Sequence, residues 1–501
     1  MFRLRRLCID TLREHVIFIH EAAVVAGELG FNPLDRVRVT GTDATDGSTR
    51  ELTGTLNFCG DALIASDEIG LSEVAFRDLG LSEGAMVSAT LSPAPRSVDL
   101  VRQKLRGERL DRGAFDAILA DVVRHRYSRV ELAMFVIACG VQTLDQEEII
   151  DFTRAMIDAG RRLDFGPGPI ADKHCIGGVP GNRTTMIVVP ILAALGVTMP
   201  KTSSRAITSP AGTADTMGLL ARVDLVPDEV HRVVREAGAC ITWGGALDLA
   251  PADDILITVE RPMELDTEPQ MVASILAKKK TAGATHVLID IPTGPSAKVR
   301  TVDAADRLAA LFKVVGTAID LRVETVITEA RGPIGRGIGP RLEALDVLAV
   351  LHGDPQASRS LREKSLYLAA RLLELVGAAT QSGGYHAARE TLDSGAAARA
   401  FDRIVAAQGA RTLPPEARHR ATVSASTDGR IRAIDCWEIA RLAKRAGAPV
   451  NPSAGVRLLR SIGHVVTRGE PLFEVHAQSA AQLESALAYA AEHPAIVSYG
   501  F

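Results

Sequence analysis

Residues 170–196 read IADKHCIGGVPGNRTTMIVVPILAALG, in which a short apolar run is followed by a glycine-rich loop and then by an apolar stretch of helical length. The same order recurs at residues 197–202 (VTMPKT), before a helical segment around Met217, and at residues 285–292 (THVLIDIP), before residues 303–315. Strands that alternate with helices predict βα units on a largely parallel sheet. We therefore expect an α/β fold that binds its ligand beyond the carboxyl ends of the strands.

The segments on either side of this region have different patterns. Residues 15–92 contain short β-branched runs separated by turns, residues 98–160 have helical spacing, and short strands return after residue 422. The sequence thus predicts a multidomain α/β protein with four parts. They are a β-rich N-terminal oligomerisation domain (1–93), a helical lobe (98–165, joined by helices from about 215–285), an α/β phosphate- and substrate-binding domain (166–420) and an α+β C-terminal domain (421–501).

Composition excludes several classes of protein. The 501 residues are 47% hydrophobic and 24% charged, which excludes a disordered chain or a coiled coil. The formal net charge of -4 provides no general attraction to nucleic acid or to an anionic membrane, so we expect neither partner. The six cysteines form no CxxC pair or zinc-binding spacing, which favours a reducing compartment and no metal site. Acidic residues interrupt the start where a signal peptide needs an apolar run, so we expect a cytoplasmic protein.

The glycine-rich loop at residues 172–185 (DKHCIGGVPGNRTT) is the first candidate site. Its glycines allow backbone N–H groups to approach a ligand, and Lys173 and Arg183 add positive charge next to the start of a helix. These features suit an oxyanion such as phosphate. No lysine follows the last glycine as in a Walker motif, and a plain strand-to-helix connection is the alternative.

Two further segments have donors for an anion. Residues 201–215 contain six hydroxyl side chains and Arg205, more than helix capping requires, although a solvated turn capped by Thr213 and Asp215 is the alternative. Ser274 and Lys278 are four residues apart and share a helix face, although lysine runs are most often solvated. The loop with Gly294 and Lys298 follows a buried strand, and we expect it to open toward the same cleft.

Four motifs in order resemble the thymidine phosphorylase family of nucleoside phosphorylases: DKHCIGGVPGN from residue 172, SSRAITSPAGTADTM from residue 203, LAPAD from residue 249 and SILAKK from residue 274. The resemblance covers about 400 residues from the helical lobe onward. The β-rich addition before residue 98 and the form SRAITSPAGT resemble the AMP phosphorylase branch. The resemblance implies that phosphate displaces a base from a pentose in a cleft between two closing domains, giving free base and a sugar 1-phosphate or, from AMP, ribose 1,5-bisphosphate.

The resemblance also implies roles for individual residues. Asp266 falls where the AMP phosphorylase branch places its proton donor, and no cofactor or metal is implied, because inorganic phosphate is a co-substrate. Cys175 stands where the family usually has serine, Pro180 lengthens the loop, and Arg261 matches the pyrimidine-steering arginine only with a small gap. Lys173 and Thr185 fall in the phosphate loop, and the implied nucleotide-binding residues are Gly178, Ser204, Arg205, Ala206, Ile207, Thr208, Ser209, Thr213, Ser274 and Lys298.

Breaking the glycosidic bond builds positive charge on the sugar and negative charge on the leaving base, and both must be stabilised. Phosphate held at Lys173 would act as nucleophile and counter-charge to the sugar, while Asp266 would protonate the leaving base. An exposed aspartate titrates near ~3.9, so Asp266 must be buried or lie near an anion to keep its proton, and its alternative is a helix N-cap. His174 is expected to shape the loop, and GRGIG at residues 335–339 is expected to be a connector.

Two other functions remain open at this point. A phosphoribosyltransferase similar to the anthranilate enzyme would also bind phosphate on glycine-rich loops, but it needs acidic magnesium ligands, of which the sequence has no convincing pair. A non-catalytic nucleotide-binding or assembly protein is the second alternative. If the reaction is phosphorolysis, we expect the substrate to be a nucleoside or a nucleoside monophosphate, with AMP favoured over thymidine. We also expect a homodimer or larger homo-oligomer.

Overall fold

The computed structural model describes residues 1–25, 30–142, 144–206, 209–263, 265 and 267–500. Contacts within the chain divide it into two units. The first is Met1–Gly160 with Ala250–Ser274, and the second is Arg161–Leu249 with Ile275–Phe501. In the part of the chain that is described, no helix is both long and apolar enough to cross a membrane.

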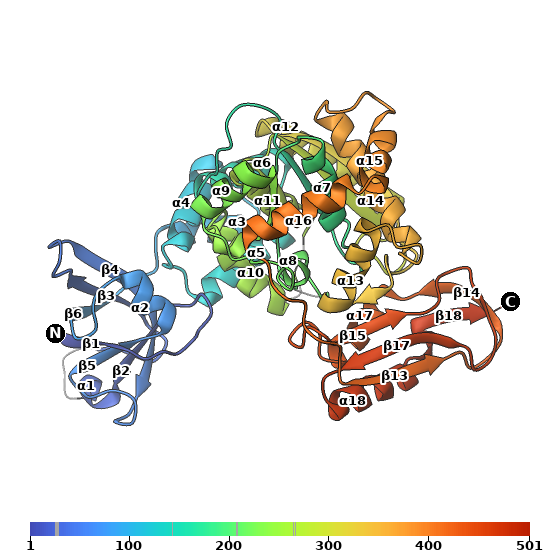
Figure 1. Cartoon of the computed structure of the whole chain (residues 1–501). Helices are drawn as coiled ribbons and strands as arrows, with labels where there is room; N and C mark the ends of the chain where they lie inside the picture. Colours follow the sequence, from blue (N-terminus) through green and yellow to red (C-terminus); the bar gives the residue numbers. More distant parts are fainter. Residues whose placement is uncertain (26–29, 143, 207–208, 264, 266, 501) are drawn as a thin grey trace. The chain divides into compact units, whose positions relative to one another are not determined.

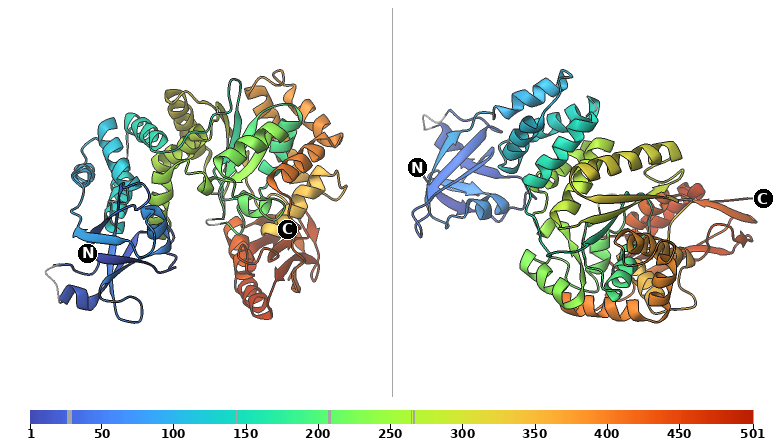
Figure 2. Two further views of the ribbon diagram at one scale, coloured as in Figure 1. Left: turned by 60° about the vertical axis from the view of Figure 1, so that its left-hand side comes forward. Right: turned by 90° about the horizontal axis from the view of Figure 1, so that it is seen from above.

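The N-terminal domain of the first unit is a closed barrel with the strand order β1-β5-β2-β4-β3-β6 (blue in Figures 1 and 2). Closure leaves no strand edge unpaired. The sequence predicts a strand at β3, where side chains alternate between the inside and outside of the barrel and Val37 and Val39 are buried. β1 and β5 were not predicted from the sequence. In β1, Phe2 and Leu4 point inward between exposed arginines. The elements are β1 (Phe2–Arg6), β2 (Val16–His20), α1 (Glu21–Val25), β3 (Arg36–Thr42), β4 (Thr49–Cys59), β5 (Glu68–Leu71), α2 (Glu73–Leu79) and β6 (Met86–Leu91).

The helical lobe completes the first unit. Ser128 and Asp145 begin two of its helices with capping boxes, and Phe115, Phe135 and Phe152 are buried in its core. Only residues 250–274 join this lobe, a narrower range than the sequence predicts, because α8 and α9 belong to the second unit. The helices are α3 (Ser97–Leu105), α4 (Arg112–Val123), α5 (Arg129–Val141), α6 (Gln146–Asp158), α10 (Pro251–Met263) and the first half of α11 (Glu268–Thr281).

The second unit is built on parallel strands. β10 pairs with β7 on one side and with β11 on the other, and β8 pairs with β9, all in parallel. A parallel bridge between Ile170 and Thr198 joins β7 to β8. The largely parallel sheet expected from the alternation is therefore present, with two strands that the sequence analysis missed, β9 and β11. The strands are β7 (Ala171–Cys175), β8 (Met199–Ser203), β9 (Ala239–Trp243), β10 (His286–Thr293) and β11 (Arg322–Glu329).

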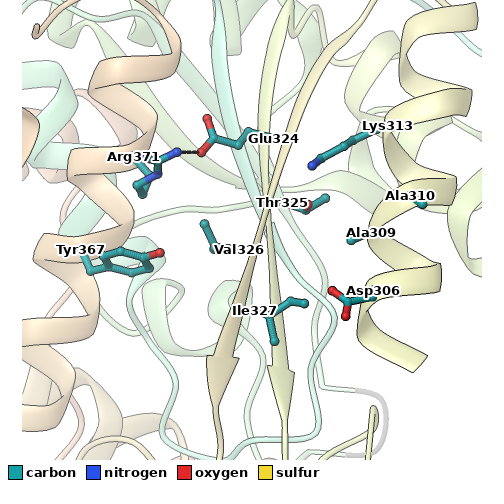
Figure 3. A pocket seen from close by; sticks show the side chains of 10 residues that line it. All are labelled: Asp306, Ala309, Ala310, Lys313, Glu324, Thr325, Val326, Ile327, Tyr367 and Arg371. Carbon is teal, nitrogen blue, oxygen red and sulfur yellow. Dashed lines mark hydrogen bonds and ion pairs between the residues drawn. The ribbon is translucent and has the colours of Figure 1, made fainter. Parts of the chain in front are cut away.

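Helices cover this sheet. α7 is buried along almost its whole length, which its apolar sequence dictates. α12 and α14 lie on opposite faces of β11, so that successive residues of this strand point toward one helix and then the other (Figure 3). The helices are α7 (Thr185–Ala194), α8 (Thr213–Met217), α9 (Pro227–Ala237), α12 (Val302–Ala318), α13 (Pro340–Leu351), α14 (Arg359–Leu375), α15 (Gly384–Asp393) and α16 (Ala396–Gln408), with the 3-10 turn η1 (Gly244–Ala246).

The C-terminal part of the second unit has two small antiparallel sheets and two helices (red in Figure 1). The segment 335–339, expected to be a connector, contributes a short strand that pairs with β15. It thereby links the α/β part to the C-terminal sheet. The elements are β12 (Gly337–Ile338), β13 (His419–Ser424), β14 (Gly429–Ile434), α17 (Cys436–Arg445), β15 (Gly455–Leu458), β16 (Val465–Val466), β17 (Pro471–Ala477), α18 (Ala480–Glu492), η2 (Pro494–Ile496) and β18 (Val497–Gly500).

Candidate functional site

Three loops leave the parallel strands at their carboxyl ends. They cover residues 176–184 after β7, residues 204–206 and 209–212 after β8 and residues 294–301 after β10. Because β7 lies between β10 and β8 and all three strands run in parallel, the loops emerge at the same edge of the sheet. This is the edge at which open α/β sheets bind their ligands.

Two glycines of the first loop allow other segments to approach it closely. Gly178 has φ +80°, and a Cβ on it would lie 2.5 Å from the backbone nitrogen of Lys298. Gly181 has φ +70°, and a Cβ on it would collide with the carbonyl oxygen of Ile334. Both the backbone angle and the available space therefore exclude a side chain. Gly178 and Lys298, two residues predicted to bind the nucleotide, are thus in direct proximity.

Lys173 places a buried ammonium group beneath this loop. The side chain extends from β7, is only 1% exposed, and donates from Nζ to Thr184 Oγ1 at 2.8 Å. Thr184 in turn donates to Asn182 Oδ1 at 3.1 Å, and the buried Thr185 is the first residue of α7. Burial lowers the pKa of Lys173. The ammonium therefore lies at the amino end of a helix, where backbone N–H groups also favour an anion.

Cys175 is engaged within the same loop. Asn182 Nδ2 donates to its sulfur at 3.2 Å, and burial raises the pKa of the thiol to about 11. The thiol is therefore protonated at neutral pH and can offer only a weak hydrogen bond to an anion. Asn182 could not be predicted from the sequence, because an asparagine in a loop has no distinctive spacing.

A second group of buried charges adjoins Lys173. Asp172 lies 3.3 Å from Lys201 Nζ and 2.8 Å from Lys279 Nζ, measured from its two carboxylate oxygens. All three side chains are less than 5% exposed. Burial lowers the pKa of Lys201 to about 7, against the opposing attraction of Asp172. Two ammonium groups thus share the carboxylate of Asp172. Lys173 interacts instead with the buried carboxylate of Asp290 on β10, which also lies 3.0 Å from Lys364 Nζ. Together the two groups have more positive than negative side chains.

His174 lies within this positive field. Burial lowers the pKa of its imidazole well below the usual value, and the charges of Lys279 and Lys201 lower it further. The imidazole is therefore neutral and adds no positive charge at neutral pH. A neutral ring is compatible with the loop-shaping role that the sequence favours for His174.

The second loop is closed by one carboxylate. Asp215 accepts hydrogen bonds from the backbone nitrogens of Ala206 at 2.6 Å and Gly212 at 2.8 Å, so it caps α8 and also fixes the loop. Ser209 uses its hydroxyl within the loop, donating to the carbonyl oxygen of Ala211 at 2.8 Å. Ser204 and Arg205 are exposed, and the Arg205 guanidinium lies 4.5 Å from the ring centre of Trp243.

Arg183 connects the first loop to the second. It donates to Thr213 Oγ1 at 2.9 Å and to the carbonyl oxygen of Ala211 at 3.2 Å. Its Nε lies 2.6 Å from a carboxylate oxygen of Glu343 on α13. Burial raises the pKa of Glu343 to about 7, although Arg183 opposes the rise. Glu343 was missed from the sequence because it lies 160 positions beyond Arg183 in an ordinary helix.

The structure describes only some of the remaining residues that the sequence predicts for the site. Ser274 is half-buried on α11 in the first unit, four residues before Lys278. Arg261 is exposed in the last turn of α10. Lys298 has an exposed side chain. Asp266, Ile207 and Thr208 lie outside the described residues.

A cavity of about 470 Å³ lies along β11, separated from β7 by β10. Figure 3 shows it between α12 and α14, with Glu324 directed toward Arg371 on one side of the strand and Thr325 on the side of Lys313. None of the residues predicted to bind phosphate or nucleotide lines it. The loops at the carboxyl ends of the strands therefore remain the candidate site.

Three family models match the chain in sequence order. The helical bundle domain of the glycosyl transferase family matches residues 98–160, and the a/b domain of that family matches residues 167–398. The pyrimidine nucleoside phosphorylase C-terminal domain matches residues 430–496. The order of these domains agrees with the helical, α/β and C-terminal parts of the fold.

Relatives match over nearly the whole length. The chain is 51% identical over 490 residues to a protein named "Putative thymidine phosphorylase" from Polaromonas sp. strain JS666, covering 98% of this chain and 94% of the relative. A protein of the same name from Methylococcus capsulatus is 47% identical over 487 residues, covering 97% and 93%. Among solved structures, anthranilate phosphoribosyltransferase from Thermus thermophilus superposes with a TM-score of 0.53 at 21% identity, covering 62% of this chain and 99% of that one. The last likeness shows a shared fold.

Proposed function

Because this chain belongs to the thymidine phosphorylase family, we propose that it catalyses the phosphorolysis of a nucleoside 5'-monophosphate, with AMP as the favoured substrate. Inorganic phosphate displaces the base, and the products are free base and ribose 1,5-bisphosphate. The reaction needs no cofactor, and phosphate is the co-substrate. Family membership supports the reaction class, and the choice of AMP rests on the second loop.

We assign inorganic phosphate to the loop after β7. The observation that carries this assignment is the excess of positive charge at β7 and β10, where four ammonium groups face two buried carboxylates. Lys201 and Lys279 share Asp172, and Lys173 and Lys364 share Asp290. Burying charge without compensation is costly, so such a cluster is best explained by an anion that neutralises it when bound. Backbone N–H groups of the loop and the start of α7 at Thr185 add donors.

A phosphate in this position serves two roles in the reaction. It is held as the nucleophile, which replaces a bimolecular encounter with a positioned one. Its negative charge also stabilises the positive charge that develops on the sugar as the glycosidic bond breaks. We assign Asp266 as the general acid that protonates the leaving base, a contribution typically worth ~10²–10⁴ in rate.

The second loop supports a 5'-phosphate on the substrate. Ser204 and Arg205 are exposed at the carboxyl end of β8, and Arg205 is held over the ring of Trp243. An arginine fork suits the planar contact with a phosphate group. Ser209 and Thr213 are already hydrogen-bonded to Ala211 and Arg183, which indicates a loop fixed in advance. The other residues assigned to the nucleotide are Gly178, Ala206, Ile207, Thr208, Ser274 and Lys298.

Two properties of the whole protein belong to the same proposal. We assign it to the cytoplasm, in keeping with the six free cysteines. We also propose a homodimer or larger homo-oligomer, because α5 has an exposed apolar face with Val130, Ile137 and Val141 at helical spacing. The mass of the purified protein in solution tests this, and a monomer contradicts it.

The alternative functions have less support. The structural likeness to anthranilate phosphoribosyltransferase is at 21% identity, whereas the relatives near 50% identity carry the name of a nucleoside phosphorylase. A non-catalytic nucleotide-binding protein would have little need for buried ammonium groups next to a glycine loop.

The test is to incubate the purified protein with phosphate and, separately, with AMP, CMP, UMP, thymidine and uridine, and to measure free base. Identical incubations without phosphate are the control, because phosphorolysis requires it and hydrolysis does not. Release of adenine from AMP supports the proposal. Release from thymidine and not from AMP would contradict the 5'-phosphate requirement, and no release from any substrate would favour a binding protein.

A further inference from the structure

A cluster of two histidines and one aspartate lies in the first unit and involves none of the residues assigned to phosphate or nucleotide. His15 directly precedes β2, Asp78 lies at the end of α2, and His125 lies in the turn between α4 and α5. Each side chain offers one metal-binding atom, and the three atoms lie within 4.8 Å of one another. Two donors thus come from the barrel and one from the helical lobe.

The hydrogen bonds of His15 determine where its lone pair points. Nδ1 lies 3.3 Å from the carbonyl oxygen of Thr53, which can only accept, so Nδ1 carries the hydrogen. In the neutral ring, the lone pair is then on Nε2, which lies 3.0 Å from a carboxylate oxygen of Asp78. Two acceptors face each other at this distance only when a cation lies between them, either a proton or a metal ion.

His125 supplies the third donor at the same place. Its ring centre lies 3.9 Å from that of His15, and Arg36 holds the turn by donating to the backbone carbonyl oxygen of His125. Arg36 also donates to Thr55 Oγ1 at 2.9 Å, so its guanidinium is directed at acceptors other than the cluster. His15 is buried and Asp78 is exposed, so the carboxylate end of the cluster is in contact with solvent.

We propose that His15, Asp78 and His125 form a binding site for a divalent transition-metal ion, of which zinc is the type that suits these donors best. Two imidazole nitrogens and one carboxylate oxygen are common zinc ligands, and a fourth position remains for water. With bonds of ~2.0–2.1 Å, tetrahedral geometry places donors roughly 3.3 Å apart. The 3.0 Å between His15 and Asp78 is close to this spacing, and the His125 nitrogen, within 4.8 Å of both, must move closer to them to complete the set.

The backbone contact of His15 supports a metal rather than a surface ion pair. Histidines that bind metals usually donate their other ring N–H to a carbonyl or carboxylate, which fixes the ring and its tautomer. The Thr53 carbonyl has this role here. The site links two domains whose other polar contacts include Arg13 with Asp254 at 3.1 Å and Arg129 with Glu14 at 3.3 Å. The metal acts as a clamp between barrel and helical lobe.

The test is calorimetric titration of metal-free full-length protein with zinc chloride, together with unfolding temperatures measured with and without zinc. The expected result is one zinc ion per chain and a higher unfolding temperature in its presence. Asp78→Asn and His125→Ala should each weaken zinc binding by about 100-fold or more, since even ligand-supporting groups are worth 10–100-fold. Asp78→Asn keeps the size of a partly exposed side chain, so its folding is expected to be retained.

His20→Ala is the matched control. His20 forms a pair of the same chemistry with Asp61 at 2.8 Å in the same barrel, but within the described part of the chain it belongs to no three-donor cluster. This variant should bind zinc as the wild-type protein does. The proposal is overturned if the wild-type protein binds no zinc, if Asp78→Asn and His125→Ala bind it equally well, or if His20→Ala weakens binding as much. Absence of binding would leave a proton between His15 and Asp78.

Discussion

Substituting alanine at Gly178 and, separately, at Gly177 distinguishes two effects on the candidate site: the close approach of the Lys298 segment and the strain of a left-handed backbone. Both glycines have left-handed backbone angles, φ +97° at Gly177 and φ +80° at Gly178. An alanine in this region costs roughly 1–2 kcal/mol of backbone strain, so both variants should share this loss of folding stability, and Gly178→Ala should lose more because the added methyl group also displaces a neighbouring segment. The two positions differ in what surrounds the added methyl group.

At Gly177 the added Cβ has nothing within 4 Å, whereas at Gly178 it would lie 2.5 Å from the backbone nitrogen of Lys298. Ordinary contact begins at 3.4 Å, so the Lys298 segment must move by about 0.9 Å. A misplacement of ~1 Å in a substrate-positioning group can cost ~10² in rate. We therefore expect Gly178→Ala to lower kcat/KM for phosphorolysis by about 100-fold, and Gly177→Ala to leave it within a few-fold of the wild-type value.

The assay is the initial rate of base release at varied phosphate and nucleotide concentrations, with the unfolding temperature of each variant measured in parallel. A large loss of rate in Gly178→Ala only, with both variants folded at the assay temperature, would support the inference that Gly178 positions the Lys298 segment. Equal rates in the two variants would refute it. A loss confined to Gly177→Ala would show that strain in the loop, not the approach of Lys298, controls the reaction.

Three further predictions concern single side chains. Glu343→Gln removes a carboxyl group whose pKa is raised from 4.5 to about 7. In the wild-type protein, this group's contribution to the free energy of unfolding is full below pH 4.5 and is lost as the pH rises through 7. The free energy of unfolding changes by an amount on the order of 3 kcal/mol over this range. The difference in unfolding temperature between the wild-type protein and the variant (wild type minus variant) should therefore be larger at pH 5 than at pH 8. A difference that does not depend on pH would contradict this. Asp266→Asn should lose turnover while still binding nucleotide in a titration, and a near-normal rate would remove Asp266 from the mechanism. Arg205→Ala should lower kcat/KM for AMP by about 10-fold or more, because it removes the equivalent of one charge-assisted hydrogen bond. The variant should leave any activity on thymidine unchanged, because thymidine has no 5'-phosphate. Equal losses on both substrates would argue against contact between Arg205 and a 5'-phosphate.

The strands and helices with strong local patterns could be predicted from the sequence. Apolar runs such as residues 285–292 become β10, and the helical spacing of residues 303–315 becomes α12. β1 and β11 were missed because charged residues interrupt them, and these charges are tolerated only where one face or edge of the strand reaches solvent. Such exposure depends on the neighbours that the fold supplies, which a single strand does not reveal.

The sequence by itself determined the glycine-rich loop, the positive residues within it, and the parallel arrangement that brings the loops after β7, β8 and β10 to one edge. These follow from local rules, because loop conformation and strand alternation are set by residues close together along the chain. Only the tertiary structure decided that Glu343 joins Arg183, that Lys201 and Lys279 share Asp172, and that His15, Asp78 and His125 meet. Those partners are tens to more than a hundred residues apart, and the energy of burying each charge or lone pair depends on which distant groups the folded chain places beside it.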